Sequence, residues 1–508
     1  MSSFGGSDAS AGSVHVFWAG ITMRTKGLAA MAAGLLGCAN PVHADDWTGV
    51  YIGIGGGMGA ANHDLSFENG PNVGLPFGAE LSGLGGDGGF FSLGVGLDYQ
   101  VNSRFVVGAF FDYDWADLDT SLDASLSLGG PTFGAGADIE VEDMWSIGGR
   151  LGYLVSPSTM LFLTAGYSQA DVSDLTANAS FIGPVTLARV GDFDGYFIGG
   201  GAEMKITKAI SIKGEYRYTD LDSEVITLLP GTGPIGGVVN SLVTTKLDPD
   251  IQTARVSLNY RFGLGGDRGV EPEEPSAPMG SWTQFYLSIG GGYAFTNEEL
   301  TLGPGPELAG APFGFNVGFD GFGGEGGALT IGGGYDYQFA PKFVAGLLID
   351  YTMHGADTDL DLNIGNFLTA NVGFGLDNEL SIGGRLGYLV TPQTLIYGSI
   401  GYSRIELDDA RLSVNFGPGS FGTRVASSGA IDGFFLGGGI ETKITDNISL
   451  KLDYRYTNGD SEQITLLPDV LPEANDFVRA EIDPDIQTVR MSLDYRFNFG
   501  GADPAPLK

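Results

Sequence analysis

The stretch Ile210-Ser-Ile-Lys-Gly-Glu-Tyr-Arg-Tyr-Thr219 alternates apolar or small residues with polar residues at every step. In an extended chain, successive side chains point to opposite faces. One face of this stretch carries isoleucine, glycine and tyrosine, and the other carries Ser211, Lys213, Glu215 and Arg217. Strict alternation over about ten residues predicts a β-strand rather than a helix.

The chain contains two tandem copies of one sequence pattern. Ser146–Val155 recurs unchanged as Ser381–Val390, and Asp248–Thr253 recurs as Asp483–Thr488. A segment rich in proline, glutamate and glycine separates the copies and has the composition of a linker. We therefore divide the mature chain into a first barrel repeat over 46–262, a linker over 263–281 and a second barrel repeat over 282–497.

Residues 1–44 have the features of a leader with a signal peptide. A short basic segment follows Met23, the run Gly27–Gly37 is apolar, and Ala44 ends a small-residue cleavage pattern. The apolar run is shorter than the roughly 20 residues that a membrane-spanning helix needs. We expect translation to start at Met23 and cleavage to follow Ala44. Residues 498–508 form a C-terminal tail after the second copy.

The composition excludes several classes of protein. Asp and Glu number 61 against 25 Lys and Arg, which gives a net charge of −36. Such a charge repels phosphate backbones, so nucleic acid is not an expected partner. One cysteine cannot form a disulfide or a cysteine-based metal site within the chain. Apolar residues make up 43% of the sequence, which is too many for a disordered acidic tail.

Each copy contains eight predicted strands joined alternately by tight turns and by long connections. This alternation is typical of outer-membrane barrels, and about ten residues suffice for a tilted strand to cross the membrane. The predicted fold class is all-β: two fused eight-stranded transmembrane antiparallel up-and-down β-barrels. In the first copy we place the strands near 47–57, 89–100, 104–115, 144–155, 159–169, 193–206, 209–219 and 251–262.

Two other architectures are compatible with alternating strands. All sixteen strands could close one porin-sized barrel around water, but that barrel needs only a tight turn where the 19 residues of 263–281 intervene. A soluble β-sandwich would bury the apolar face and expose the charged one. The leader and the alternation of short and long connections argue against the sandwich.

The cost of solvation decides which face of the strands meets lipid. A lysine or arginine on the lipid face costs roughly 2–4 kcal/mol at the bilayer midplane. Charged strand residues are therefore expected inside the barrels, with Arg150 beside Asp112 and Arg385 beside Asp350. The predicted interior network consists of Asp112, Arg150, Lys213, Glu215, Arg217, Arg255, Arg261, Asp350, Arg385, Lys451, Asp453, Arg455, Arg490 and Arg496.

The ends of the first copy resemble a known family. Trp47-Thr-Gly-Val-Tyr-Ile-Gly-Ile-Gly-Gly-Gly57 after a signal peptide, with Tyr260-Arg-Phe262 closing the copy, is similar to the small outer-membrane β-barrel proteins of Gram-negative bacteria. That family includes porin-like surface antigens and some haem-binding proteins. The resemblance implies an eight-stranded barrel in the cell outer membrane, inserted by the outer-membrane assembly machinery and usually without known catalysis. Family members are commonly single barrels, whereas this chain fuses two.

Few residues could carry catalysis or bind a metal. After cleavage the only histidines are His63, placed in a long loop, and His354, placed at the top of a strand; both are interpreted as surface residues. Gly53–Gly59 contains a glycine pattern found in dinucleotide sites, but no helix follows it. The acidic residues from Asp112 to Asp119 are expected to form a solvated rim. We predict no catalytic site, cofactor or metal.

One long connection is nearly identical in the two copies. Ser223–Pro230 recurs as Ser461–Pro468 with one change, whereas the other long connections differ. It forms either an ordered ribbon above the membrane or a shared contact surface.

The predicted function is that of a non-enzymatic integral outer-membrane protein, porin-like and exposed at the cell surface. Its expected partners are outer-membrane lipids, the assembly machinery and an extracellular ligand that the sequence does not identify. The alternative is a sixteen-stranded porin that passes small, preferentially cationic solutes, since a net charge of −36 favours cations at a pore mouth.

Overall fold

A computed structural model gives the structure of the chain. It describes residues 47–70, 78–128, 132–179, 183–230, 232, 234–263, 280–308, 313–364, 368–416, 419–427 and 429–497. The predicted leader, most of the predicted linker and the predicted tail lie outside the described residues. No helix in the described ranges has the length and apolar character needed to cross a membrane.

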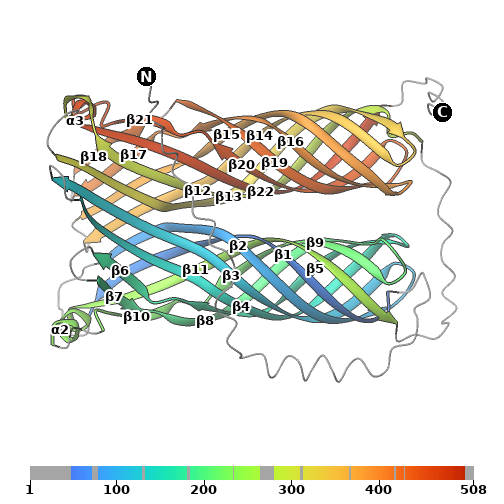
Figure 1. Ribbon diagram of the computed structural model, residues 1–508, viewed down its shortest axis with the longest axis horizontal. Helices are drawn as coiled ribbons and strands as arrows, with labels where there is room; N and C mark the ends of the chain where they lie inside the picture. Colours follow the sequence, from blue (N-terminus) through green and yellow to red (C-terminus); the bar gives the residue numbers. More distant parts are fainter. Residues whose placement is uncertain are drawn as a thin grey trace, which may run out of the picture. The chain divides into compact units, whose positions relative to one another are not determined.

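The first copy forms a ring of eight long strands, drawn from blue to green in Figure 1. Each strand pairs antiparallel with the next along the ring. The first strand, β1, pairs with β2 on one side and with the last strand, β11, on the other, so the ladder returns to its start. The strands are β1 (Gly49–Asn69), β2 (Gly78–Gln100), β3 (Phe105–Leu128), β4 (Thr132–Ser156), β5 (Thr159–Val172), β8 (Gly191–Lys205), β9 (Ile210–Leu221) and β11 (Val243–Gly263).

The second copy forms its own ring, drawn from yellow to red in Figure 1. Its first strand, β12, pairs with β13 and with the last strand, β22. A single sixteen-stranded barrel would require β11 to pair with β12, but β11 pairs with β1 and β9 along its length, so that alternative is wrong. The strands are β12 (Gln284–Pro304), β13 (Phe313–Ala340), β14 (Phe343–Ile364), β15 (Leu368–Thr391), β16 (Thr394–Leu407), β19 (Ala430–Lys443), β20 (Ile448–Gly459) and β22 (Val478–Phe497).

Shorter elements extend the ring at the end that carries the long connections. In the first copy they are β6 (Leu175–Ala179), β7 (Gly183–Arg189), β10 (Glu224–Leu228) and helix α2 (Pro234–Leu242). In the second copy they are β17 (Ala410–Phe416), β18 (Gly419–Ser427), β21 (Glu462–Leu466), the 3-10 turn η2 (Pro306–Leu308) and helix α3 (Ala474–Phe477).

Most ring strands are longer than the sequence analysis predicted. The third strand was expected over 104–115, but β3 continues to Leu128 and pairs with β4 over most of that length. Crossing the membrane takes only about ten residues, so the remainder extends beyond the lipid as hydrogen-bonded ribbon. Backbone pairing makes this possible, because two extended segments joined by a short turn satisfy each other's polar groups.

Alternate residues of each ring face in and out. On β9, Lys213, Glu215 and Arg217 are buried, whereas Leu163 on β5 is 65% exposed. Aromatic side chains lie on the outer surface at two levels. Near the tight turns, Phe105 packs against Tyr153, and further along the strands Trp145 packs against Tyr167. These levels match the aromatic belts that outer-membrane barrels place at the two interfaces.

The ring interior is layered. At the tight-turn end Trp47 is fully buried and donates from Nε1 to the carbonyl oxygen of Pro157, 3.1 Å away. Charged side chains fill the middle. Above them an apolar cluster that includes Leu118, Phe193 and Ile251 fills the end formed by the long connections. Trp282 and a second apolar cluster repeat this order in the other copy.

Candidate functional site

The middle layer of the first ring is an ion-pair cluster assembled from four strands. Arg150 on β4 donates from Nε to Asp98 on β2 at 2.7 Å and from a terminal nitrogen to Glu203 on β8, also at 2.7 Å. Arg261 on β11 donates to Asp98 at 2.5 Å and to Glu203 at 3.2 Å. Each of the two arginines thus bonds both carboxylates, which offsets part of the cost of burying four charges.

A second group lies in the same layer. Arg217 donates to Asp112 at 2.9 Å and to Glu215 at 3.1 Å, and its guanidinium lies 4.3 Å from the ring centre of Phe197. Arg255 donates to Asp114 at 3.1 Å. Charge-assisted bonds of this kind are stronger than neutral ones, and stacking on an aromatic face adds to them.

The second ring repeats the cluster with different numbers. Arg385 and Arg496 both donate to Asp336, at 2.8 and 2.9 Å, and both contact Glu441. Arg455 donates to Asp350 at 2.6 Å. The same chemical arrangement therefore fills both interiors.

All fourteen residues predicted for the interior network are buried, with 7% exposure or less. Their pairing differs from the expectation. Arg150 contacts Asp98 and Glu203 instead of Asp112, and Arg385 contacts Asp336 and Glu441 instead of Asp350. The carboxylates that pair with each arginine lie on other strands of the ring. Alternation along one strand does not specify which of these residues meet.

The predicted network did not include the carboxylates that complete the clusters around Arg150 and Arg385: Asp98, Glu203, Asp336 and Glu441. Asp98 and Glu203 recur 238 residues later as Asp336 and Glu441, so comparison of the two copies could have identified them. Tyr51 lies beside the Arg150 cluster. It is 3% exposed and lies inside the ring, 4.8 Å from the guanidinium of Arg150.

Interior glycines make room for these side chains. A Cβ at Gly94 would lie 2.4 Å from Oδ1 of Asp112, and a Cβ at Gly152 would lie 2.2 Å from the sulfur of Met160. The glycines therefore admit larger neighbours into a filled interior, as expected for an eight-stranded ring.

His63 is buried inside the first ring, not in a loop as predicted. It lies on β1, seven residues beyond Gly56, which is paired with Phe91 at the aromatic level. Its side chain is 1% exposed, and neither ring nitrogen has a hydrogen-bond partner among the described residues. Burial lowers the pKa of His63 to about 4, so the imidazole is neutral at pH 7.

Glu298 occupies the same place in the second ring. His63 pairs with Pro249 of β11, and Glu298 pairs with Pro484 of β22. Glu298 is 1% exposed, and its Oε2 has no hydrogen-bond partner among the described residues. Burial raises the pKa of Glu298 to about 8, so its carboxyl is mostly protonated at pH 7.

His354 is also buried, which corrects its interpretation as a surface residue. Its Nε2 lies 3.4 Å from Oε2 of Glu379. The other oxygen of Glu379 accepts hydrogen bonds from Ser381, Ser403 and Thr457 at 2.7–3.0 Å. These three hydroxyls donate to the glutamate, so the cluster links neighbouring strands inside the ring.

Three carboxylates gather on the outside of the first ring above the aromatic level. One oxygen each from Asp117, Asp119 and Glu140 lies within 4.8 Å of the others. Burial, with the neighbouring Asp119 and Asp117, raises the pKa of Glu140 to about 7. Calcium takes six to eight oxygen ligands, so three carboxylates do not complete a site. Asp112 and Asp114 face inward and do not join this group.

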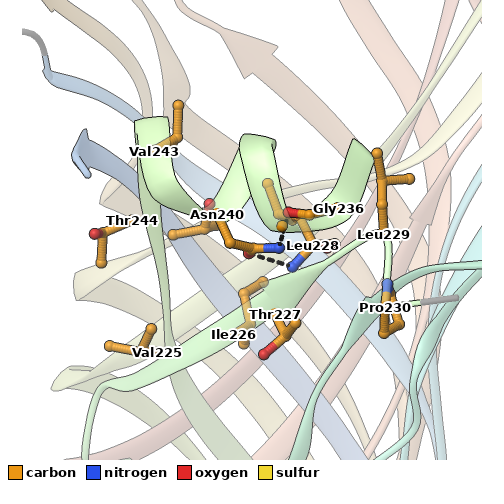
Figure 2. Close-up of a pocket in the computed structure, with 12 residues that line it drawn as sticks. Val225, Ile226, Thr227, Leu228, Leu229, Pro230, Gly236, Asn240, Val243 and Thr244 are labelled. Carbon is orange, nitrogen blue, oxygen red and sulfur yellow. Dashed lines mark hydrogen bonds between the residues drawn. The ribbon is translucent and has the colours of Figure 1, made fainter. Parts of the chain in front are cut away.

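The nearly identical connection, Ser223–Pro230 and Ser461–Pro468, is an ordered ribbon that ends in a hydrogen-bonded tip in both copies. In the first copy Asn240 of α2 pairs with the backbone of Leu228. Its Oδ1 accepts from the Leu228 amide at 2.9 Å, and its Nδ2 donates to the carbonyl oxygens of Leu228 and Gly236 at 2.7 Å (Figure 2). Asn475 pairs with Leu466 in the same way at 2.7 and 2.9 Å. The asparagine amide thus takes the place of a neighbouring strand.

The backbone at each tip is strained at the following leucine. Leu229 has φ +49° and Leu467 has φ +47°, in the left-handed region that bulky residues rarely adopt. Such residues cost about 1–3 kcal/mol and persist where surrounding contacts hold them. Here the leucine amides donate to Leu187 and Val425 at 2.7 and 2.9 Å.

A family model for the outer-membrane protein beta-barrel domain matches residues 29–262 and again residues 275–497. The chain belongs to this family. The double match agrees with the two rings, and the protein is an integral protein of the outer membrane.

Curated relatives agree with this assignment. The 31 kDa outer-membrane immunogenic protein of Brucella melitensis is 30% identical over 233 residues, which covers 44% of this chain and 87% of the relative. The 22 kDa outer membrane protein of Rhizobium leguminosarum bv. viciae is 27% identical over 198 residues, which covers 38% of this chain and 72% of the relative.

Matches of the chain to solved structures have low TM-scores. The outer membrane protein OprG of Pseudomonas aeruginosa has 12% identity and a TM-score of 0.25, and the match covers 44% of this chain and 100% of OprG. A mutant of the monoaromatic hydrocarbon channel TodX has 11% identity and a TM-score of 0.28, and the match covers 92% of this chain and 94% of TodX.

Proposed function

We propose that the protein is a non-conducting, non-enzymatic surface protein of the outer membrane, built as two plugged barrels. The filled interior of each ring is the observation that carries this proposal. Trp47, the Arg150 cluster and the apolar cluster around Phe193 occupy successive layers of the first ring. An eight-stranded ring has just enough interior for side chains, so these layers leave no aqueous path.

The outer face and the end with the long connections suit three expected partners: outer-membrane lipids, the assembly machinery and an extracellular ligand. Large apolar side chains such as Leu163, Ile198 and Val256 point outward, which suits acyl chains of outer-membrane lipids. The last strand, β22, ends in Tyr495 and Phe497, a pattern suited to the outer-membrane assembly machinery. In such barrels the long connections face the cell exterior, so the tips are the parts open to an extracellular ligand.

The absence of catalysis is part of the proposal. The histidine that could have served a barrel enzyme, His354, has a side chain with no exposed surface and contacts Glu379. A general base must reach its substrate within hydrogen-bonding distance, and a buried imidazole offers no such approach. We expect His354→Ala to leave lipid composition and surface proteolysis unchanged.

Planar-bilayer recording of the refolded full chain tests the proposal. We expect silence or brief small openings, since side chains fill both rings. A sixteen-stranded porin reconstituted in parallel supplies the positive control. A steady, large conductance with cation selectivity would overturn the proposal.

A further inference from the structure

The turn between β2 and β3 in the first ring and the matching turn between β13 and β14 in the second both end in a positively charged residue. They read Val101-Asn-Ser-Arg104 and Phe339-Ala-Pro-Lys342, so all four residues differ and only the charge of the last is kept. The backbone is held alike, because the carbonyl oxygen of the last turn residue accepts a hydrogen bond from Leu154 or Leu389 at 2.8 Å. This backbone tolerates different residues at the first three positions, so the charge kept at the fourth calls for its own explanation.

Each of these two cations lies against a tyrosine on the outer surface of its ring. Nη1 of Arg104 donates to Oη of Tyr153 at 3.3 Å, and Nζ of Lys342 donates to Oη of Tyr388 at 3.3 Å. The phenylalanine that follows each cation packs against the same tyrosine, with ring centres 5.5 and 5.4 Å apart and 67° between the ring planes in both copies. Arginine and lysine differ in shape, so what the copies share is a positive charge beside a phenol.

We propose that each pair, Arg104 with Tyr153 and Lys342 with Tyr388, binds the phosphate group of an anionic phospholipid. The cation supplies the opposite charge. The tyrosine oxygen accepts from the cation, so its own O–H is left to donate to a phosphate oxygen. Neither pair includes a carboxylate, so the ammonium group of a zwitterionic headgroup finds no partner of opposite charge in it.

The surface next to each pair suits the acyl chains of the same lipid. One residue pair further from the turn on the outer face, Val107 opposes Leu151 in the first ring, and Leu386 lies in the corresponding place in the second. These side chains are 41%, 53% and 59% exposed. Aromatic side chains mark the membrane interface at this level, and long basic side chains reach from it toward headgroups. The headgroup and the chains of a phospholipid thus meet polar and apolar groups in the matching order.

A second tight turn shows that positive charge is not a general feature of this end of the rings. Lys208 is exposed in the turn between β8 and β9, and the matching residue of the second copy is Asp446. The backbone of these two turns is also held alike, since the amides of Ile206 and Ile444 each donate at 2.8 Å to the isoleucine four positions later. The charge therefore reverses between copies here, whereas it is kept beside Tyr153 and Tyr388.

The inference rests on the proposed orientation of the rings, in which the tight turns face the periplasmic leaflet, whose lipids are phospholipids. It does not depend on whether the rings conduct, so its failure would leave the test by planar-bilayer recording unaffected.

Native mass spectrometry of the refolded full chain in detergent, titrated with phosphatidylglycerol, tests the inference by counting bound lipids and measuring their dissociation constants. We expect two saturable sites that bind phosphatidylglycerol about 5-fold or more tightly than phosphatidylethanolamine. Excess inorganic phosphate should displace no more lipid than chloride at the same ionic strength, because free phosphate makes no apolar contact.

Four variants locate the binding. Arg104→Gln should weaken one site about 5-fold, and Lys342→Gln should weaken the other by a similar factor. Tyr153→Phe keeps the aromatic ring and should weaken the first site about 2- to 10-fold, the loss expected for one hydrogen bond. Lys208→Gln removes an exposed cation from the same end of the ring and should leave both sites unchanged. Heat-modifiable migration on gels verifies that each variant is folded.

Three results would overturn the inference. Equal binding of the two lipids would show that the pairs do not recognise an anionic headgroup. Displacement of the lipid by inorganic phosphate would assign the pairs to free phosphate. Equal losses in Arg104→Gln and Lys208→Gln would reduce the effect to general surface charge.

Discussion

The two rings share their charged middle layer and differ in the layer above it. Arg150 with Asp98 and Glu203 matches Arg385 with Asp336 and Glu441, contact for contact. Above these clusters, the first ring buries a histidine at position 63 where the second buries a glutamic acid at position 298. Few combinations of side chains can fill the charged layer at the level of the membrane, because every buried charge needs a partner of opposite charge. The region beyond the lipid accepts different buried groups.

Breaking the shared layer should have the largest effect, and the effect should be equal in the two copies. Arg150→Met leaves Asp98 and Glu203 with one arginine instead of two, and Arg385→Met does the same to Asp336 and Glu441. Removal of one partner from a buried ion pair costs about 3–5 kcal/mol of unfolding free energy. Urea unfolding followed by tryptophan fluorescence measures the loss.

The control for this comparison is Arg404→Met. The Arg404 side chain is 52% exposed, and its pair with Asp432 is long, at 3.8 Å. An exposed pair contributes little, so the variant should unfold almost as the parent does. If Arg150→Met lowers the free energy of unfolding no more than Arg404→Met does, the ion-pair layer does not stabilise the ring.

The layer above should respond to pH with opposite signs in the two copies. The pKa of His63 is about 4 in the folded ring and 6.5 when unfolded, so stability is complete above pH 6.5 and falls by roughly 3 kcal/mol as the pH drops to 4. The pKa of Glu298 is about 8 folded and 4.5 unfolded, so its contribution is complete below pH 4.5 and is lost as the pH rises through 8.

Substitution of His63 or Glu298 by glutamine removes the titrating group, and the two variants serve as matched controls. His63→Gln should lose the destabilisation between pH 6.5 and 4, and Glu298→Gln should lose the one between pH 4.5 and 8. Hydrogen exchange of peptides from β1 and β12, measured across this pH range, reports each ring separately. Slopes of the same sign in the two parent rings would show that burial does not govern these groups.

The smallest expected effect concerns the feature that the two tips share. Asn240→Ala removes three hydrogen bonds around Leu228, and Asn475→Ala removes the equivalent bonds around Leu466. We expect local opening to become about 1–3 kcal/mol easier in each tip, since backbone groups lose their partners. Amide exchange at Leu228 and Leu466 measures the change. Unchanged exchange in both variants would mean that water replaces the asparagine without cost.

The strands and the direction of their side chains could be predicted from the sequence, because alternation has a period of two and lipid rejects charge. The burial of Lys213, Glu215 and Arg217 follows from this rule. The two copies and their family also follow, since the repeats and the motifs at their ends are local. Strand length was underestimated beyond the membrane, where residues 116–128 still alternate and pair with β4 after a register shift between Trp115 and Leu118.

Only the tertiary structure decided which charges meet. Asp98, Arg150, Glu203 and Arg261 lie on four different strands, and the closure of the ring brings them together. The same closure buried His63 and His354, which the sequence had placed at the surface. Alternation fixes the side of a strand on which a residue lies. Contacts across a ring depend on the stagger of all eight strands, which no single segment of sequence encodes.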